Sequence, residues 1–173
     1  MSYLRKRWLW ALLAVLCLIG TLAGVAALPV AATDFRSGDA VTVGRDEVIN
    51  DDLVVSANTV LVEGTVNGDL IAFGSQVTVT GTVGGSCALA GQRVLFNGRV
   101  NGSLYAAAAS VTLGGQAAVD RNVYAAAYGV TIERGAVVTR DVSATGYQVL
   151  INGQVQNNVR SASEAFELNG QVG

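Results

Sequence analysis

Few side chains in this sequence are suited to acid–base or metal chemistry. The 173 residues include no His, so the commonest general base and metal ligand is missing. Two acids stand out, because Asp52 and Asp69 begin a regularly spaced series that continues with Ser86, Ser103, Asn122, Asp141 and Asn158. Neighbouring carboxylates would suit a hard cation such as Ca²⁺. The alternative is a series of turn-forming residues without a metal.

The other candidates for catalysis are equally sparse. Cys87 takes the place of a Leu in an apolar series, which favours a buried thiol over a nucleophile. No pair of acids is arranged as the hydrolysis of a glycosidic bond requires. We therefore expect no catalytic residue, no cofactor and no enzyme activity, and Asp52 and Asp69 remain the only weak metal candidates.

The elements that carry these residues follow from an internal repeat. Glycines recur at nearly constant intervals, at Gly64, Gly81, Gly98, Gly115, Gly135, Gly153 and Gly170. The unit TVNGDLIAFGSQVTVTG, residues 65–81, defines the places of the repeat, of which the second, sixth, eighth, thirteenth and fifteenth are apolar in almost every unit. Of these 35 positions, 33 hold an aliphatic residue or Phe, and the exceptions are Cys87 and Ser161.

The spacing of the apolar places predicts strands. The sixth and eighth places alternate, as do the thirteenth and fifteenth, and Asn-Gly, Gly-Gly or Gly-Ser pairs separate the runs. Three short strands and their turns would return the chain to its start after each unit. The sequence thus predicts an all-β solenoid, a parallel β-helix of about seven 17–18-residue coils over residues 48–173, with residues 33–47 as a lead-in and partial coil.

The handedness follows from the remaining places. A left-handed hexapeptide helix needs an aliphatic residue every six positions, and the fourteenth place breaks that rule with Thr78, Thr112, Thr131 and Glu167. This place is expected to face mostly solvent. The general hand of parallel crossovers favours a right-handed coil.

The outward places also carry apolar residues. Val54, Ile71, Tyr105 and Tyr124 share the seventh place and form a predicted lateral patch, and Tyr128 and Tyr147 share the eleventh. An exposed apolar stripe often marks association, and tyrosines can stack on sugars. The alternative is that these side chains only stabilise neighbouring strands.

The N-terminal segment, residues 1–32, differs in composition from the rest. Arg5, Lys6 and Arg7 precede an apolar run over residues 8–32, which is long enough to cross a membrane. The positive cluster stays in the cytoplasm, so the remainder is expected outside the cytoplasmic membrane, in the cell envelope or secreted. The segment is either a cleaved signal peptide or a retained anchor that holds the protein on the membrane.

The charge of the chain gives no sign of a nucleic-acid partner. The formal net charge is −2 at pH 7, and the eight Arg residues beyond residue 32 are scattered without a basic stripe.

The repeats resemble a known family. Segments such as VEGTVNGDLIAFGSQVTVTGTVGG and FNGRVNGSLYAAAASVTLGG, with the motif Gly-x-Val-x-Gly-Asp/Ser-Leu-x-Ala, are similar to those of the bactofilins, polymer-forming cytoskeletal proteins of bacteria. The resemblance covers roughly residues 41–173. It implies a right-handed β-helix that polymerises end to end into filaments near a membrane without nucleotide. Typical members are cytoplasmic, whereas this sequence carries an export segment.

These observations favour a self-assembling structural protein of the cell envelope whose main partner is itself. The expected assembly interface consists of the apolar places of the end coils: Val155, Val159, Phe166 and Leu168 at one end, and Val41 and Val43 at the other. The alternative is an exported β-helix that does not polymerise and binds surface carbohydrate or an envelope protein. For the C-terminal coil, a second explanation is that the chain is a fragment whose remaining repeats and cap are missing.

Overall fold

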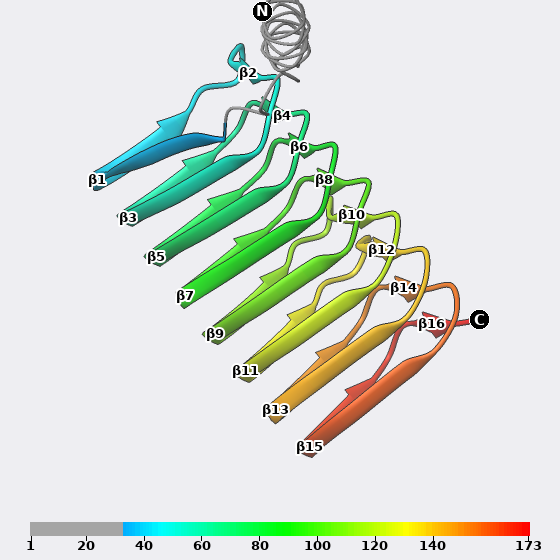
Figure 1. The fold of residues 1–173 in the computed structure, drawn as a ribbon. Helices are drawn as coiled ribbons and strands as arrows, with labels where there is room; N and C mark the ends of the chain where they lie inside the picture. The colour runs from blue at the N-terminus through cyan, green and yellow to red at the C-terminus, as the bar shows by residue number, and fades with distance from the viewer. Residues whose placement is uncertain (1–32) are drawn as a thin grey trace, which may run out of the picture. The chain divides into compact units, whose positions relative to one another are not determined.

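The chain folds into a parallel β-solenoid in which one long and one short strand alternate (Figure 1). The computed structural model describes residues 33–173, and the predicted export segment, residues 1–32, lies outside the described residues. The long strands have ten residues each: β1 (Asp34–Val43), β3 (Leu53–Val62), β5 (Leu70–Val79), β7 (Cys87–Phe96), β9 (Leu104–Leu113), β11 (Val123–Ile132), β13 (Val142–Ile151) and β15 (Val159–Leu168). The short strands have two: β2 (Val48–Ile49), β4 (Thr65–Val66), β6 (Thr82–Val83), β8 (Arg99–Val100), β10 (Ala118–Val119), β12 (Val137–Val138), β14 (Gln154–Val155) and β16 (Gln171–Val172).

Each set of strands forms one sheet along the solenoid. The long strands pair in the order β1-β3-β5-β7-β9-β11-β13-β15, and the short strands pair in the matching order. Every strand pairing is parallel. Within residues 33–173, no helix is long and apolar enough to cross a membrane.

The solenoid has one coil more than the seven predicted. β1 is a full long strand that pairs with β3 from Asp34 to Val43, so the partial coil predicted over residues 33–47 begins with a complete long strand. This coil escaped the repeat search because its sixth and eighth places hold Asp34 and Arg36 instead of apolar residues.

The coils have two lengths, and the longer ones exceed the predicted range. Equivalent positions are separated by 17 in the shorter coils, as Asp52 and Asp69 are, and by 19 in the longer ones, as Asn122 and Asp141 are. The longer coils contain a four-residue turn, in which the fourth N–H donates to the first carbonyl; the turns are residues 44–47, 114–117 and 133–136, with N···O distances of 3.0, 2.9 and 3.1 Å. Gly135, in the last of these turns, has φ of 98°, a conformation that strongly favours glycine.

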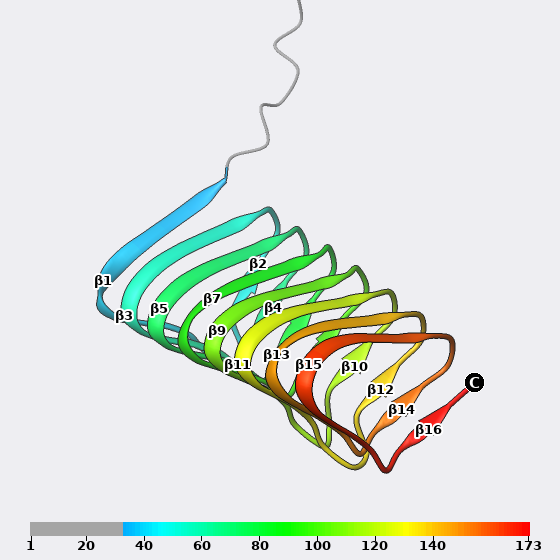
Figure 2. The same ribbon diagram turned by 90° about the horizontal axis from the view of Figure 1, so that it is seen from below.

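Each coil has two strands rather than the three predicted, because places six to fifteen form one bent strand (Figure 2). Alternate side chains point inward from the sixth to the eighth place and again from the thirteenth to the fifteenth. The eighth and thirteenth places are an odd number of residues apart, so both can point inward only if the strand bends between them. The pairing skips the eleventh place at this corner, as between Tyr128 and Tyr147.

The five predicted apolar places form the core. Of their 35 residues all are buried except Val159, Ser161, Phe166 and Leu168, which lie together on β15. Each buried Val or Leu stabilises the fold by about 1.5–3 kcal/mol before chain entropy is subtracted.

The fourteenth place was predicted to face mostly solvent; it points outward between two buried places, but it is more covered than expected. Its residues are half-buried from Leu61 to Leu150, and only Glu167 is exposed. Leu61 and Leu95 flank Thr78 in adjacent strands and cover it, which explains the partial burial.

Candidate functional site

The predicted metal candidates act as hydrogen-bond acceptors between coils. Asp52 Oδ1 accepts the backbone N–H of Asp69 at 2.8 Å, and Asp69 Oδ1 accepts that of Ser86 at 2.7 Å. A Cβ atom on Gly85 would collide with Asp69 Oδ1, which explains the Gly-Asp and Gly-Ser pairs of the repeat. Among residues 33–173, no three His, Cys, Asp or Glu side chains converge as a metal site requires.

The same ladder continues further along the solenoid. Asp141 Oδ1 accepts hydrogen bonds from both the side-chain and the backbone N–H of Asn158, at 3.0 and 3.1 Å. These two bonds, the side-chain bond foremost, hold the pKa of Asp141 below its usual value. The geometry therefore supports the turn-forming interpretation of these residues.

The thiol of Cys87 is buried in the core, as predicted for a residue in an apolar place. Burial raises its pKa far above that of a free thiol, and the nearby Asp69 charge acts in the same direction. A thiol that is protonated and inaccessible has neither the charge nor the access that a nucleophile needs.

Apolar side chains are exposed on the last coil. Phe166 and Leu168, on β15, are 45% and 44% exposed; Val172 on β16 is also exposed, and Val159 is half-buried. We call these four residues the terminal apolar surface. β15 and β16 are the last strands of their sheets, so their outer backbone groups have no strand partner within residues 33–173.

Other residues expected at the assembly ends are covered. Val155 is 1% exposed because Val172 of β16 pairs beside it and covers it. At the opposite end, Val43 is fully buried and Val41 is half-buried. The exposed apolar side chains of the predicted interface therefore lie on the last coil.

The first coil carries charge at two of its inward places, Asp34 and Arg36. Arg36, on an inward place, pairs with Glu47 at 2.6 Å and with Asp34 at 2.9 Å. The hydrogen bonds from Arg36, foremost among several causes, lower the pKa of Glu47, and the two carboxylates raise the pKa of Arg36. The sequence analysis missed this cluster, although charged residues at alternate places of a strand were a visible signal.

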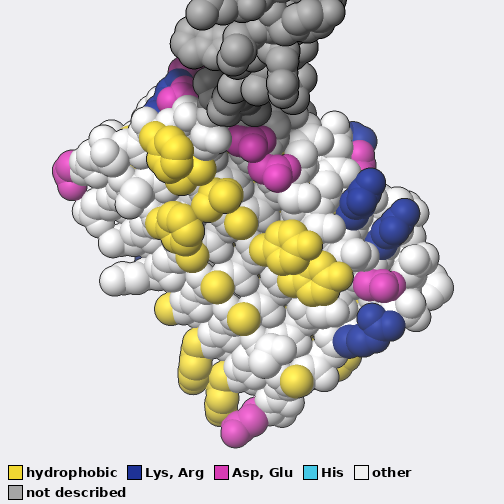
Figure 3. Space-filling view, in the orientation of Figure 1, with side chains coloured by type: hydrophobic (Ala, Val, Ile, Leu, Met, Phe, Trp, Pro, Cys, Tyr) yellow, Lys and Arg dark blue, Asp and Glu magenta, His cyan; other side chains and the backbone are white. Residues whose placement is uncertain are grey.

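The predicted lateral patch is present as a stripe on the outer face of the long strands. Tyr105 and Tyr124 stack with ring centroids 5.1 Å apart and planes 9° from parallel, and Ile71 is exposed in the same ladder, whereas Val54 is half-buried. Figure 3 shows apolar side chains in a band over these strands. Phe73 is also exposed on this face and was missed because it is the single aromatic residue at its place in the repeat.

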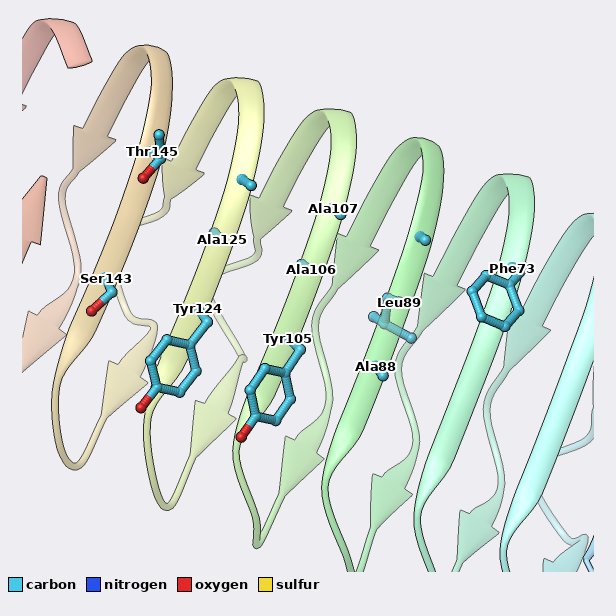
Figure 4. Close-up of a pocket in the computed structure, with 12 residues that line it drawn as sticks. Phe73, Ala88, Leu89, Tyr105, Ala106, Ala107, Tyr124, Ala125, Ser143 and Thr145 are labelled. Atoms are coloured by element: carbon cyan, nitrogen blue, oxygen red, sulfur yellow. The ribbon is translucent and has the colours of Figure 1, made fainter. Parts of the chain in front are cut away.

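A groove of about 460 Å³ lies on this face and is lined by twelve residues from β5, β7, β9, β11 and β13 (Figure 4). Tyr105 and Tyr124 project from neighbouring strands, and Phe73 stands two strands from Tyr105. Alanines, including Ala88 and Ala107, lie between and beside the rings. The groove is shallow and open to solvent, and most of its lining is apolar.

A second tyrosine pair lies at the corner of the coil, apart from the groove lining. Tyr128 and Tyr147 stack at 4.9 Å with planes 1° from parallel, and both are exposed. Stacked pairs of this kind add about 0.5–1.5 kcal/mol to stability beyond the area they bury.

The chain matches no family model, and no curated protein or solved structure was found to be similar to it.

Proposed function

We propose that this protein is a structural component of the cell envelope that assembles end to end through its coil edges, without nucleotide and without catalysis. The terminal apolar surface is the observation that carries this proposal. Val159, Phe166, Leu168 and Val172 occupy places that are buried in the preceding coils, so a further coil on top of them would complete the core.

Assembly of this kind uses the interaction that already holds the solenoid together. Each long strand pairs in parallel over nearly its whole length with the next, as β13 does with β15. A second copy that adds a strand to β15 would gain the same backbone hydrogen bonds and cover the exposed part of the Phe166 side chain. This mode of growth agrees with the resemblance to the bactofilins, which also implies the right-handed sense of the coil.

Export is a further part of the proposal and rests on Arg5, Lys6, Arg7 and the apolar run after them. In an exported protein, the assembly lies outside the cytoplasmic membrane and is attached to it if the segment is retained. A reporter fused after Gly173 should then be active outside the cytoplasm, and activity only inside it would contradict the export.

Electron microscopy and sedimentation of the full chain test the assembly. We expect the unmodified chain to form filaments and Phe166→Arg to remain small, because the new charge would be buried unpaired in the junction. Phe73→Arg is the matched control, since Phe73 is similarly exposed but lies on the lateral face. Filaments formed equally well by Phe166→Arg would exclude the last coil as the interface.

A further inference from the structure

The groove on the lateral face is free of charge. Its twelve lining residues include no Asp, Glu, Lys or Arg, and the polar groups are the hydroxyls of two tyrosines, Ser143 and Thr145. A charged ligand would lose hydration here without gaining a partner of opposite charge. The groove therefore favours a neutral ligand with an apolar face and some hydroxyl groups.

The tyrosine stack in this groove has two free ring faces. Tyr105 and Tyr124 cover one face of each other, and their neighbours in the same ladder are Ala88 on one side and Ser143 on the other. Both neighbours are too small to cover a ring, and the tyrosines remain 47% and 41% exposed. Each end of the stack thus leaves room for a ring to pack against it (Figure 4).

The groove is too narrow for a protein partner. Five adjacent strands span roughly 19 Å along the axis, and two outward places of a strand span roughly 7 Å. This footprint is on the order of 100 Å², against about 800 Å² that each partner buries in a stable protein complex. The groove instead suits a small ligand of one or two rings.

We propose that this groove binds a short neutral glycan, one pyranose ring of which packs on a free face of the Tyr105–Tyr124 stack. The C–H groups on one face of a pyranose carry partial positive charge and are attracted to the negative face of an aromatic ring. The sugar hydroxyls can pair with the hydroxyls of Tyr105, Tyr124 and Ser143 at the edge of the groove. This function is independent of end-to-end assembly, because the groove lies on the side of the coils and not at their edges.

Titration calorimetry of the full chain, in a detergent without sugar groups, tests the proposal with three hexasaccharides. The probes are the β-1,4-linked hexamers of glucose and of N-acetylglucosamine, both neutral, and hexagalacturonate, which is charged. We expect at least one neutral probe to bind and hexagalacturonate to bind at least tenfold more weakly. Absence of binding by both neutral probes, or equal binding of the charged one, would overturn the proposal.

The variants separate the groove from the rest of the surface. Replacing Tyr105 and Tyr124 together by Ala should weaken binding at least tenfold, whereas the same change at Tyr128 and Tyr147, the stacked pair outside the groove, should change it less than twofold. Equal loss in the two double variants would overturn the proposal.

A complementary variant keeps both tyrosines and fills the space beside them. Replacing Ala88 and Ser143 together by Leu should retain thermal stability and weaken glycan binding at least tenfold, because a branched side chain then covers each free face of the stack and offers no flat ring in its place. If this variant instead abolishes side-by-side pairing of copies in sedimentation, with glycan binding unchanged, the groove belongs to a second copy and the proposal is wrong. Phe166→Arg should bind the glycan normally, which distinguishes this function from assembly.

Discussion

The carboxylate of Asp69 accepts the backbone N–H of Ser86 from the next coil at 2.7 Å. The same place holds Asp, Ser or Asn in every coil from Asp52 to Asn158, and most of these side chains accept an N–H from the coil that follows. The turn between a short and a long strand in one coil is thereby hydrogen-bonded to the equivalent turn of the next coil. One oxygen of each Asp in the ladder is therefore engaged by the backbone of the next coil.

Removal of this acceptor should lower stability without any effect of metal. Asp69→Ala is expected to reduce the free energy of unfolding by about 0.5–1.5 kcal/mol, the usual contribution of one hydrogen bond. Asp69→Asn keeps an acceptor oxygen and should lose less. Urea unfolding measures both, and neither CaCl₂ nor EDTA should move the midpoint of the unmodified chain. Stabilisation by Ca²⁺ that is lost in Asp69→Asn would instead support a cation site.

Asp141 should make stability depend on pH in the acid range. Its pKa in the folded state is lowered from the ordinary 3.8 by the hydrogen bonds of Asn158. The contribution of the Asp141 carboxylate to the free energy of unfolding is therefore fully present above about pH 4, and it is lost as the pH falls through the folded-state pKa. The difference in melting temperature between the unmodified chain and Asp141→Asn should shrink as the pH falls from 5 to about 2. A difference that is constant over this range would contradict the assignment.

The register of the core can be tested on a single strand. Val79 on β5 is fully buried. Val79→Asp should therefore lower the free energy of unfolding by about 3–5 kcal/mol or more and unfold the neighbouring coils. Gln76→Asp introduces the same charge at an exposed position of the same strand and should change stability by about 0.5 kcal/mol or less. Thermal unfolding followed by circular dichroism compares the two. Equal melting temperatures would mean that the strand is turned the other way.

The core was predictable from the sequence because each apolar place repeats in seven coils and faces the same interior. Val77, Val94 and Val111 occur in one series, and the structure pairs them in that order. Features confined to one coil carry no such signal. Phe73 pairs in a ladder with Ala90 and then Ala107, so no repeated aromatic residue marks its place in the sequence. Its position in the lining of the groove is visible only in the folded chain.

The end coils were predicted less well for a related reason. The repeat is recognisable by its apolar places, and in the first coil Asp34 and Arg36 occupy two of these places as an ion-paired cluster. Val155 was expected at the assembly end, but the two-residue strand β16 adds Val172 beside it. Residues 171–173 match the first residues of the repeat unit, but their cover of Val155 shows only in the folded chain.

The charged cluster on the first coil should stabilise that coil locally. Arg36 bonds Glu47 and Asp34 at partly buried sites, so Arg36→Ala should lower the protection of β1 amides by about 1 kcal/mol and leave β9 unchanged. Arg45→Ala removes a more exposed pair with Glu63 and should have a smaller effect. Hydrogen exchange with mass spectrometry reports each strand separately. Equal effects of the two variants on β1 would show that the cluster adds nothing beyond an ordinary surface pair.

Salt should distinguish an apolar junction from an ionic one. Phe166, Leu168 and Val172 contribute no charge, whereas Glu164 and Glu167 lie on the same strand as Phe166 and repel like charges in an approaching copy. Raising NaCl from about 0.1 to about 1 M shortens the screening length from about 10 to about 3 Å, which weakens this repulsion. The critical concentration for filament formation, measured by sedimentation, should therefore stay the same or fall. Cooling should raise it, because hydrophobic stabilisation weakens at low temperature. Filaments that dissolve in about 1 M NaCl would mean that ion pairs hold the copies together, and Phe166 would then not be the residue at the centre of the junction.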